Sequence, residues 1–131
     1  MSKLEGYLAE VETDIALTPS NVKDVQMKLP GIKHKWSARL IRCKIELNRL
    51  NSNRKELINT IARKLIEASP VNVSMLVARK KAEDHESLID YDNEVQELLI
   101  TIQFLEKTEK TLHSMSFDIK NLTEIMKLET L

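Results

Sequence analysis

Lysine and arginine side chains recur at a regular spacing in the middle of the chain, and their common chemistry is the binding of anions. Positions seven residues apart hold Lys28, Lys35, Arg42, Arg49 and Arg63, interrupted only by an acid at position 56. On a helix this spacing places one cation about every 10 Å along a single face. Such a row binds phosphates without reading a base sequence. We therefore interpret it as a polyanion-binding face.

Further cations lie beside this row and beyond the end of the same segment. The candidate anion-binding residues are Lys35, Arg39, Arg42, Arg49, Arg63, Lys64, Arg79, Lys80 and Lys81. Trp36 is the single aromatic residue of the basic block and occupies an apolar seam position, so stacking on bases is not expected to dominate. Two alternatives remain open. The basic face is an ordinary solvated surface, or it docks onto an acidic partner protein or the chain's own acidic half.

The charges of the whole chain are sorted into three blocks although they sum to zero. Residues 1–22 carry a net charge of −3, residues 23–81 a net charge of +11, and residues 82–131 a net charge of −8. Sorting of this kind is typical of a polyanion-binding segment joined to a segment with a different role. The pattern favours a binding protein.

Other kinds of chemistry find little support. There is no glycine-rich loop for a nucleotide, the three histidines are dispersed, and no Ser–His–acid arrangement stands out. We expect no enzymatic activity, no metal and no cofactor. The single cysteine, Cys43, excludes an internal disulfide, and neither a membrane span nor a signal peptide is visible, so a cytoplasmic location is expected.

Apolar periodicity predicts helices throughout. A short amphipathic helix is expected over residues 2–17, followed by a short helical segment that ends before Pro30-Gly31. Uninterrupted residues then predict a helix over residues 32–68, ended by Ser69-Pro70. Its heptad seam consists of Trp36, Leu40, Cys43, Leu47, Leu50, Arg54, Leu57 and Ile61. Arg54 is the polar exception, for which setting the register or the oligomeric state is the favoured role.

Residues 71–83 are expected to form a loop or short helix, and a second long helix to start at Asp84 or Ser87 and run to about Lys127. Its seam consists of Tyr91, Val95, Leu98, Ile102, Leu105, Leu112, Met115, Ile119, Leu122 and Met126, with a phase change near residues 112–115. The apolar stripe of this helix is wider than pairing with one partner requires, which favours self-association. The candidate oligomerisation residues are Leu98, Leu99, Ile102, Leu105, Leu112, Ile119 and Leu122.

These elements predict an all-α fold in which two long helices form an antiparallel, coiled-coil-like hairpin preceded by short N-terminal helices. We expect one helical domain over residues 1–131. Within it, residues 1–29 form an amphipathic segment, residues 30–83 a basic binding helix and turn, and residues 84–131 an acidic, apolar oligomerisation helix.

The layout resembles the UvsY-like recombination mediators of T-even-like bacteriophages over nearly the whole chain. The resemblance rests on Lys35-Trp36 at the head of the basic helix, on the segment 61–65 at its end, and on the C-terminal sequence IKNLTEIMKLE. The family's DNA-binding motif reads Lys-Ala-Arg-Leu. Ala62 and Arg63 match this motif, Ile61 replaces its lysine, and Lys64 stands before the leucine.

The resemblance implies a function and a set of partners. It implies binding of single-stranded DNA, with Arg63 as a DNA contact and Lys64 as a substitute for the missing lysine. It also implies loading of a RecA-like recombinase in place of a single-strand binding protein, and a ring-like homo-oligomer of six or seven protomers assembled through the C-terminal helix. The alternative from a different class is a coiled-coil adaptor or structural protein without a nucleic-acid role.

Overall fold

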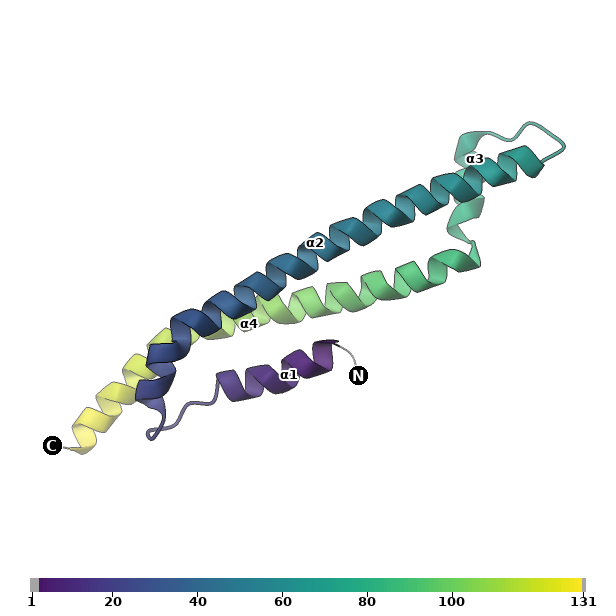
Figure 1. Cartoon of the computed structure of the whole chain (residues 1–131). Helices are drawn as coiled ribbons and strands as arrows, with labels where there is room; N and C mark the ends of the chain where they lie inside the picture. Colours follow the sequence, from purple (N-terminus) through teal and green to yellow (C-terminus); the bar gives the residue numbers. More distant parts are fainter. Residues whose placement is uncertain (1–2, 131) are drawn as a thin grey trace. The chain divides into compact units, whose positions relative to one another are not determined.

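The computed structural model describes residues 3–130, and every regular element among them is helical (Figure 1). The helices are α1 (Lys3–Asp14), α2 (Val22–Ala68), α3 (Met75–Glu83), the single 3₁₀ turn η1 (Glu86–Leu88) and α4 (Ile89–Glu129). They form two compact units: unit 1 comprises Met1–Arg42 and Thr101–Leu131, and unit 2 comprises Cys43–Ile100. The all-α prediction is confirmed.

The first helix, α1, is three residues shorter at its C-terminal end than the sequence predicted, and residue 2 of the predicted helix lies outside the described residues. The connection to α2 is held by Asn21. The backbone N–H of Thr18 donates to Asn21 Oδ1 at 2.7 Å, and Asn21 Nδ2 donates to the carbonyl oxygen of Ala16 at 3.0 Å. One side chain therefore ties the connection together immediately before α2 begins.

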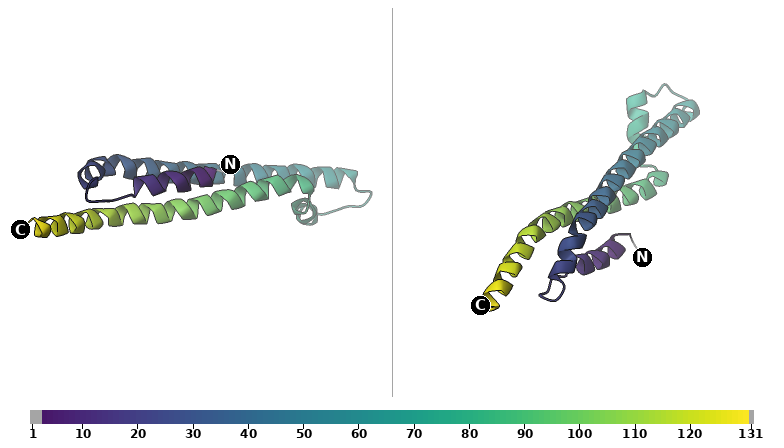
Figure 2. Two further views of the ribbon diagram at one scale, coloured as in Figure 1. Left: turned by 90° about the horizontal axis from the view of Figure 1, so that it is seen from below. Right: turned by 60° about the vertical axis from the view of Figure 1, so that its left-hand side comes forward.

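The predicted break at Pro30-Gly31 is wrong, because α2 continues through both residues. A proline removes one N–H and crowds the carbonyl of residue i−4, here Gln26, which normally costs about 3 kcal/mol. Val25 and Leu29, one turn apart, are both buried, and their packing offsets that cost. Figure 2 shows that the first turns of α2 bend away from the following ones, as expected at a proline. Lys28 therefore belongs to the helix.

In unit 1, the beginning of α2 packs antiparallel to the end of α4. Gln26 lines one groove together with Ile119, and Ser37 lines another together with Glu109. The buried core contains Trp36, Leu40, Leu105, Leu112 and Met115, among other residues. α1 runs back along α2 on another side, as Figure 1 shows.

The seam of α4 in unit 1 is continuous, so the predicted phase change near residues 112–115 is wrong. Seven positions of α4 are buried, and six of them alternate steps of four and three: Thr101, Leu105, Thr108, Leu112, Met115 and Ile119. The seventh, Ile102, lies beside Thr101. The two threonines complete the pattern, which an inspection of apolar residues alone misses. The Thr108 hydroxyl is satisfied within its own helix, because it donates to the carbonyl oxygen of Phe104 at 2.9 Å.

In unit 2, α3 packs on the end of α2 through small side chains. Ala62 of α2 and Ala78 and Ala82 of α3 are 0% exposed and share a core with Ile58 and Leu88. The predicted seam positions Leu57 and Ile61 are only partly buried, at the edge of this core. At the end of α2 the buried positions are thus Ile58 and Ala62 instead of the predicted Leu57 and Ile61, because α3 covers the face that carries Ile58 and Ala62.

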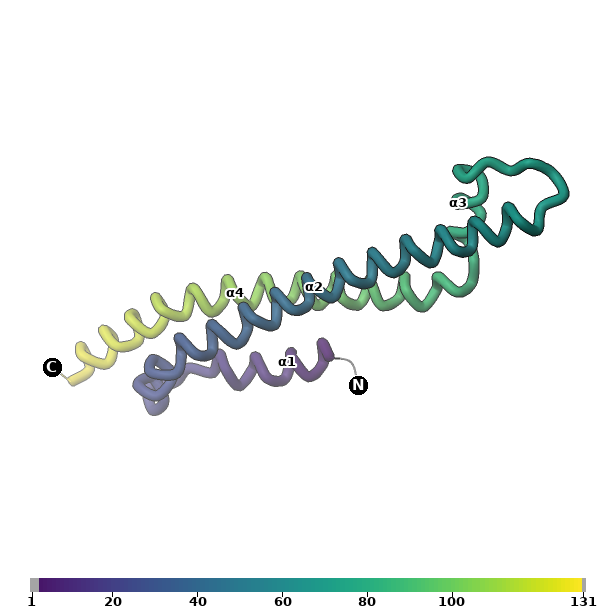
Figure 3. The backbone as a smooth tube through the Cα atoms, turned by 45° about the horizontal axis from the view of Figure 1, so that its top comes forward, coloured from purple at the N-terminus to yellow at the C-terminus, as the bar shows by residue number. Residues whose placement is uncertain are grey.

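The loop over residues 69–74 turns back past the end of α2, and α3 then runs across α2, as the tube in Figure 3 shows. Ser74 then caps α3, because its side-chain oxygen accepts from the N–H of Val77 at 3.2 Å. Beyond η1, the start of α4 runs antiparallel to α2 in this unit. Arg54 Nε donates to Asp92 Oδ1 at 2.7 Å, and Leu88 packs near Ile58. Within residues 3–130, no helix combines the length and the apolar character needed to cross a membrane.

Candidate nucleic-acid interface

Five exposed cations gather where α3 meets the end of α2 in unit 2. We call them the α3 basic cluster; its members are Arg63, Lys64, Arg79, Lys80 and Lys81. The alanine contact between α3 and α2 positions them. It brings Arg79 Nε within 3.0 Å of Asn59 Oδ1 on α2, and Asn59 lies one turn before Arg63. Two arginines from segments separated by a loop therefore lie on the same side of the unit.

The α3 basic cluster is not neutralised by the chain. None of its five side chains forms an ion pair within the described residues, and all five are exposed. The hydrogen bond of Arg79 to Asn59 orients its guanidinium without cancelling its charge. In the sequence Ile61-Ala62-Arg63, the alanine is a buried packing residue and the arginine points to solvent, so Arg63 is available to a ligand.

The basic residues of unit 1 have a different environment, because acidic α1 covers two of them. Lys35 Nζ lies 2.8 Å from Glu10 Oε2 and 2.6 Å from Asp14 Oδ2, and Arg39 Nη1 lies 2.7 Å from the same Glu10 oxygen. Trp36 Nε1 donates to Asp14 Oδ2 at 2.8 Å. We call Glu10, Asp14, Lys35, Trp36 and Arg39 the α1 clamp.

Aromatic rings add to the α1 clamp. The guanidinium carbon of Arg39 lies 4.8 Å from the ring centroid of Tyr7 and 4.7 Å from that of Trp36. The two rings meet edge to face with their centroids 5.5 Å apart. Trp36 is fully buried, as expected for a seam residue. The planar cation is thus held by rings and by a carboxylate at once, a combination that favours arginine over lysine at this position.

The clamp changes the proton affinity of two of its members. Hydrogen bonds from Arg39 and then from Lys35 lower the pKa of Glu10. Burial alone would lower the pKa of Lys35, but its hydrogen bonds to Asp14 and Glu10 outweigh that effect and raise the pKa. Both shifts favour the charged form, so each strengthens the pairing of Glu10 with Lys35 at neutral pH.

The remaining candidates of the basic row differ from one another. Arg42 is exposed and forms no ion pair within residues 3–130. Arg49 is paired on its own helix, with Nε donating to Glu46 Oε2 at 2.9 Å. An exposed pair three residues apart is worth little and leaves the arginine able to exchange partners. Lys28 pairs in the same way with Asp24, at 3.1 Å.

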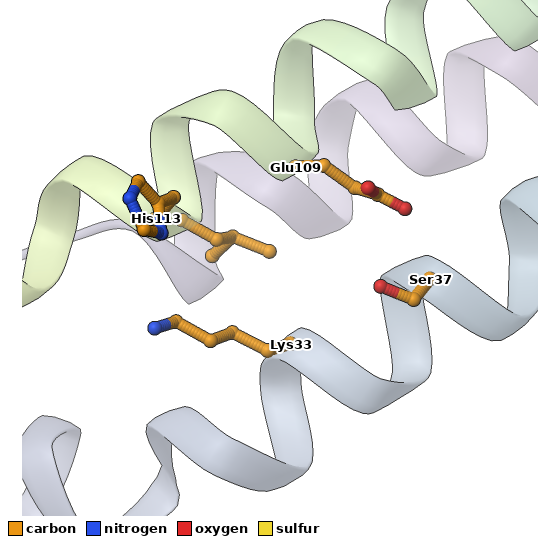
Figure 4. A pocket seen from close by; sticks show the side chains of 5 residues that line it. Lys33, Ser37, Glu109 and His113 are labelled. Atoms are coloured by element: carbon orange, nitrogen blue, oxygen red, sulfur yellow. The ribbon is translucent and has the colours of Figure 1, made fainter.

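A polar groove in unit 1 lies between α2 and α4. It is lined by Lys33, Ser37, Glu109, Leu112 and His113. Figure 4 shows Lys33 and Ser37 on α2 opposite Glu109 and His113 on α4. Serine, histidine and glutamate are the residue types of a hydrolytic triad, but no hydrogen bond joins the three within the part of the chain that is described. Lys33 instead donates to the Ser116 hydroxyl at 3.0 Å.

The residues predicted to form an oligomer interface have mixed environments. Ile102, Leu105, Leu112 and Ile119 are buried within a single chain, whereas Leu98 and Leu122 are half-buried and Leu99 is exposed. The core of unit 1 therefore accounts for the first four. Ile89 and Ile125, which belong to the wide apolar stripe expected from the sequence, are exposed. Three further exposed apolar side chains on α4 were not predicted: Ile100, Phe117 and Leu128.

The α1 clamp is the main feature that sequence reasoning missed. The signal was present, because Glu10 and Asp14 lie four residues apart and so share one face of a helix, as Lys35 and Arg39 do. Each unit is also close to neutral: unit 1 has eleven Lys/Arg against ten Asp/Glu, and unit 2 has nine against ten. The basic block therefore folds beside acidic segments of its own chain.

Comparison with known proteins identifies the fold. A crystal structure of the recombination mediator protein UvsY of bacteriophage T4 matches with a TM-score of 0.80, covering 98% of this chain and 99% of that chain at 16% sequence identity. A second crystal form of the same protein gives a TM-score of 0.78 with complete coverage of both chains, also at 16% identity. No family model and no curated protein sequence matches. The chain therefore has the fold of the T4 recombination mediator UvsY, as its sequence layout indicated.

Proposed function

We propose that this chain is a recombination mediator that binds single-stranded DNA without sequence preference and helps a RecA-like recombinase replace a single-strand binding protein on it. The observation that carries the proposal is the α3 basic cluster: five exposed, unneutralised cations on a fold shared over its whole length with a recombination mediator. A lysine or arginine that is not paired with a carboxylate can neutralise a phosphate of the DNA, and the counterions released from the DNA contribute to the affinity. No catalytic role is proposed for the chain.

Sequence-independent binding is expected from the chemistry of the cluster. It contains no aromatic side chain, so affinity comes from phosphate contacts rather than from stacked bases. Modest affinity at each protomer becomes strong when several sites are linked, because later contacts are then effectively intramolecular. Self-association, for which exposed Phe117, Ile125 and Leu128 on α4 provide apolar surface, therefore belongs to the proposal.

The test compares two variants that lose equal charge. R63A/K80A/K81A removes three cations of the α3 basic cluster, and K107A/K110A/K120A removes three exposed lysines of α4. With a slope of about 0.7 per phosphate contact on single strands, three contacts contribute about 2 logarithmic units at 0.1 M salt. Fluorescence anisotropy with a thymidylate oligonucleotide should show a loss of about 100-fold for the first variant and a much smaller loss for the second. If the two variants lose affinity equally, the α3 basic cluster is not the DNA-binding surface.

The mediator step needs a separate assay. ATP hydrolysis by a RecA-like recombinase on single strands covered with single-strand binding protein should rise when the natural chain is added, and R63A/K80A/K81A should raise it far less. If the natural chain binds single strands but does not raise ATP hydrolysis by the recombinase on covered strands, it is a DNA-binding protein and not a mediator.

A second candidate function is a coiled-coil adaptor that docks on an acidic protein. The α1 clamp favours it, because Lys35 and Arg39 are already engaged by protein carboxylates. In that case the natural chain would show no binding to the oligonucleotide even at 50 mM salt.

A further inference from the structure

α1 contacts α2 through several ion pairs and hydrogen bonds, and through few apolar side chains, chiefly Val11 and the ring of Tyr7 on Trp36. Of its twelve residues only Val11 is buried. By contrast, Glu10 and Asp14 place carboxylates within 2.8 Å of Lys35, Arg39 or the Trp36 indole nitrogen. The docking of α1 therefore depends on ion pairs together with the Tyr7–Trp36 ring contact. Salt screens the ion pairs, and other anions can take the place of the two carboxylates.

The two carboxylates are arranged like a short stretch of polyanion. Residues four apart on a helix are separated by about 6 Å along its axis, so Glu10 and Asp14 present two regularly spaced anions. They meet two cations with the same separation on α2, Lys35 and Arg39. The groups that hold these anions are an ammonium, a guanidinium and an indole N–H, all of which also bind phosphate oxygens.

The connection between α1 and α2 gives α1 room to leave without detaching. The seven residues 15–21 span up to about 23 Å when extended. The bonds that fold this connection back, Thr18 N–H to Asn21 Oδ1 and Asn21 Nδ2 to the Ala16 carbonyl, are exposed. Exposed bonds of this kind open at little cost.

We propose that Lys35, Arg39 and Trp36 form a second polyanion-binding site, that α1 occupies it as a tethered anion, and that a polyanion gains the site by displacing α1. The inference rests on the proposed function only for the identity of the polyanion, single-stranded DNA. Because α1 is tethered, it competes at a high effective concentration, and only a ligand that is already held elsewhere, such as at the α3 basic cluster of the same or another protomer, competes well. The site therefore opens late, after a strand has been captured.

The test uses Trp36, the single tryptophan of the chain, as its own probe. It is 0% exposed with α1 docked, so displacement of α1 should shift its emission to the red and make it more accessible to acrylamide. Inorganic polyphosphate serves as the first ligand because it has no bases to quench the indole. A thymidylate oligonucleotide serves as the second.

Two double variants test whether removing the carboxylates of α1 raises the affinity for a polyanion. E10Q/D14N removes the tethered anions but keeps oxygen acceptors for Arg39 and Trp36, and circular dichroism checks its helix content. E12Q/D118N removes the same charge from exposed positions of unit 1 outside the clamp. E10Q/D14N should bind polyphosphate and the oligonucleotide about three- to tenfold more tightly than E12Q/D118N, since each partly exposed ion pair is worth a factor of a few. Adding K35Q/R39Q to E10Q/D14N should abolish that gain.

The outcomes separate this inference from the proposed function. If the natural chain binds polyphosphate but not the oligonucleotide and Trp36 emission shifts, the site stands and the nucleic-acid function falls. If binding is measured but Trp36 emission is unchanged, or if E10Q/D14N binds no more tightly than E12Q/D118N, α1 is a fixed part of unit 1 and the inference is wrong. The inference is also wrong if the gain survives K35Q/R39Q.

Discussion

Replacing Ala78 by leucine should undock α3 and thereby weaken DNA binding without altering any charge. Ala62, Ala78 and Ala82 are all 0% exposed where α3 meets α2, so the three carbons added at residue 78 have no free space to enter. Overpacking of this kind costs about 1 to 3 kcal/mol. For a chain of 131 residues we expect the melting temperature to fall by about 4 °C for each kcal/mol.

The consequence for binding follows from the position of Arg79. Its Nε is held 3.0 Å from Asn59 Oδ1 only while α3 is docked, so undocking separates Arg79, Lys80 and Lys81 from Arg63. Thermal melts by circular dichroism measure the first effect, and anisotropy titrations with a thymidylate oligonucleotide measure the second. The matched control is A68L, an exposed alanine on α2 of the same unit. If A78L melts and binds like A68L, the alanine contact does not position the α3 basic cluster.

Three further predictions concern the rest of the chain. The side chains of Arg54 and Asp92 are 29% and 51% exposed, so R54A should lower the free energy of unfolding by less than about 1 kcal/mol in thermal melts. R54L places an apolar side chain between buried Leu50 and Ile58 and should leave the stability unchanged or raise it. A loss of several kcal/mol for R54A would show that the fold requires the ion pair. Hydrogen bonds from Arg39 and Lys35 lower the pKa of Glu10, so its contribution to the docking of α1 is complete above its ordinary pKa of 4.5 and lost as the pH falls through the lowered value. The red shift of Trp36 emission on acidification should then be smaller in E10Q than in the natural chain, and identical titrations would contradict the assignment. F117S/I125S removes side chains that are 62% and 52% exposed and should yield smaller species in light scattering, whereas M27S, at a residue 74% exposed on α2, should not.

Much of the fold was predictable because it depends on periodicity. The seam through Trp36, Leu40, Cys43 and Leu50 is buried as predicted, and α2 ends at Ala68 as predicted. The errors occur where packing overrides a local preference. Pro30 signals a break, yet buried Val25 and Leu29 carry the helix through it.

The candidate site was predictable as a list of cations but not as a set of environments. Sequence spacing placed Lys35 and Arg63 on one row, whereas the fold pairs Lys35 with two carboxylates of α1 and leaves Arg63 open. That difference depends on the contact between α1 and α2, which joins residues more than twenty positions apart. Likewise, the α3 basic cluster exists because three alanines allow a close helix contact, and alanine gives no such signal in an apolar pattern.

The most direct measurement is hydrogen–deuterium exchange of the natural chain with and without a thymidylate oligonucleotide at 50 mM salt. The proposal predicts slower exchange in residues 59–83, where Asn59, Arg63 and Arg79 meet, and faster exchange in α1 as it leaves Lys35 and Arg39. Bound oligonucleotide that leaves residues 59–83 unprotected, or protects only the acidic start of α4, would contradict the assignment of the α3 basic cluster as the DNA-binding surface.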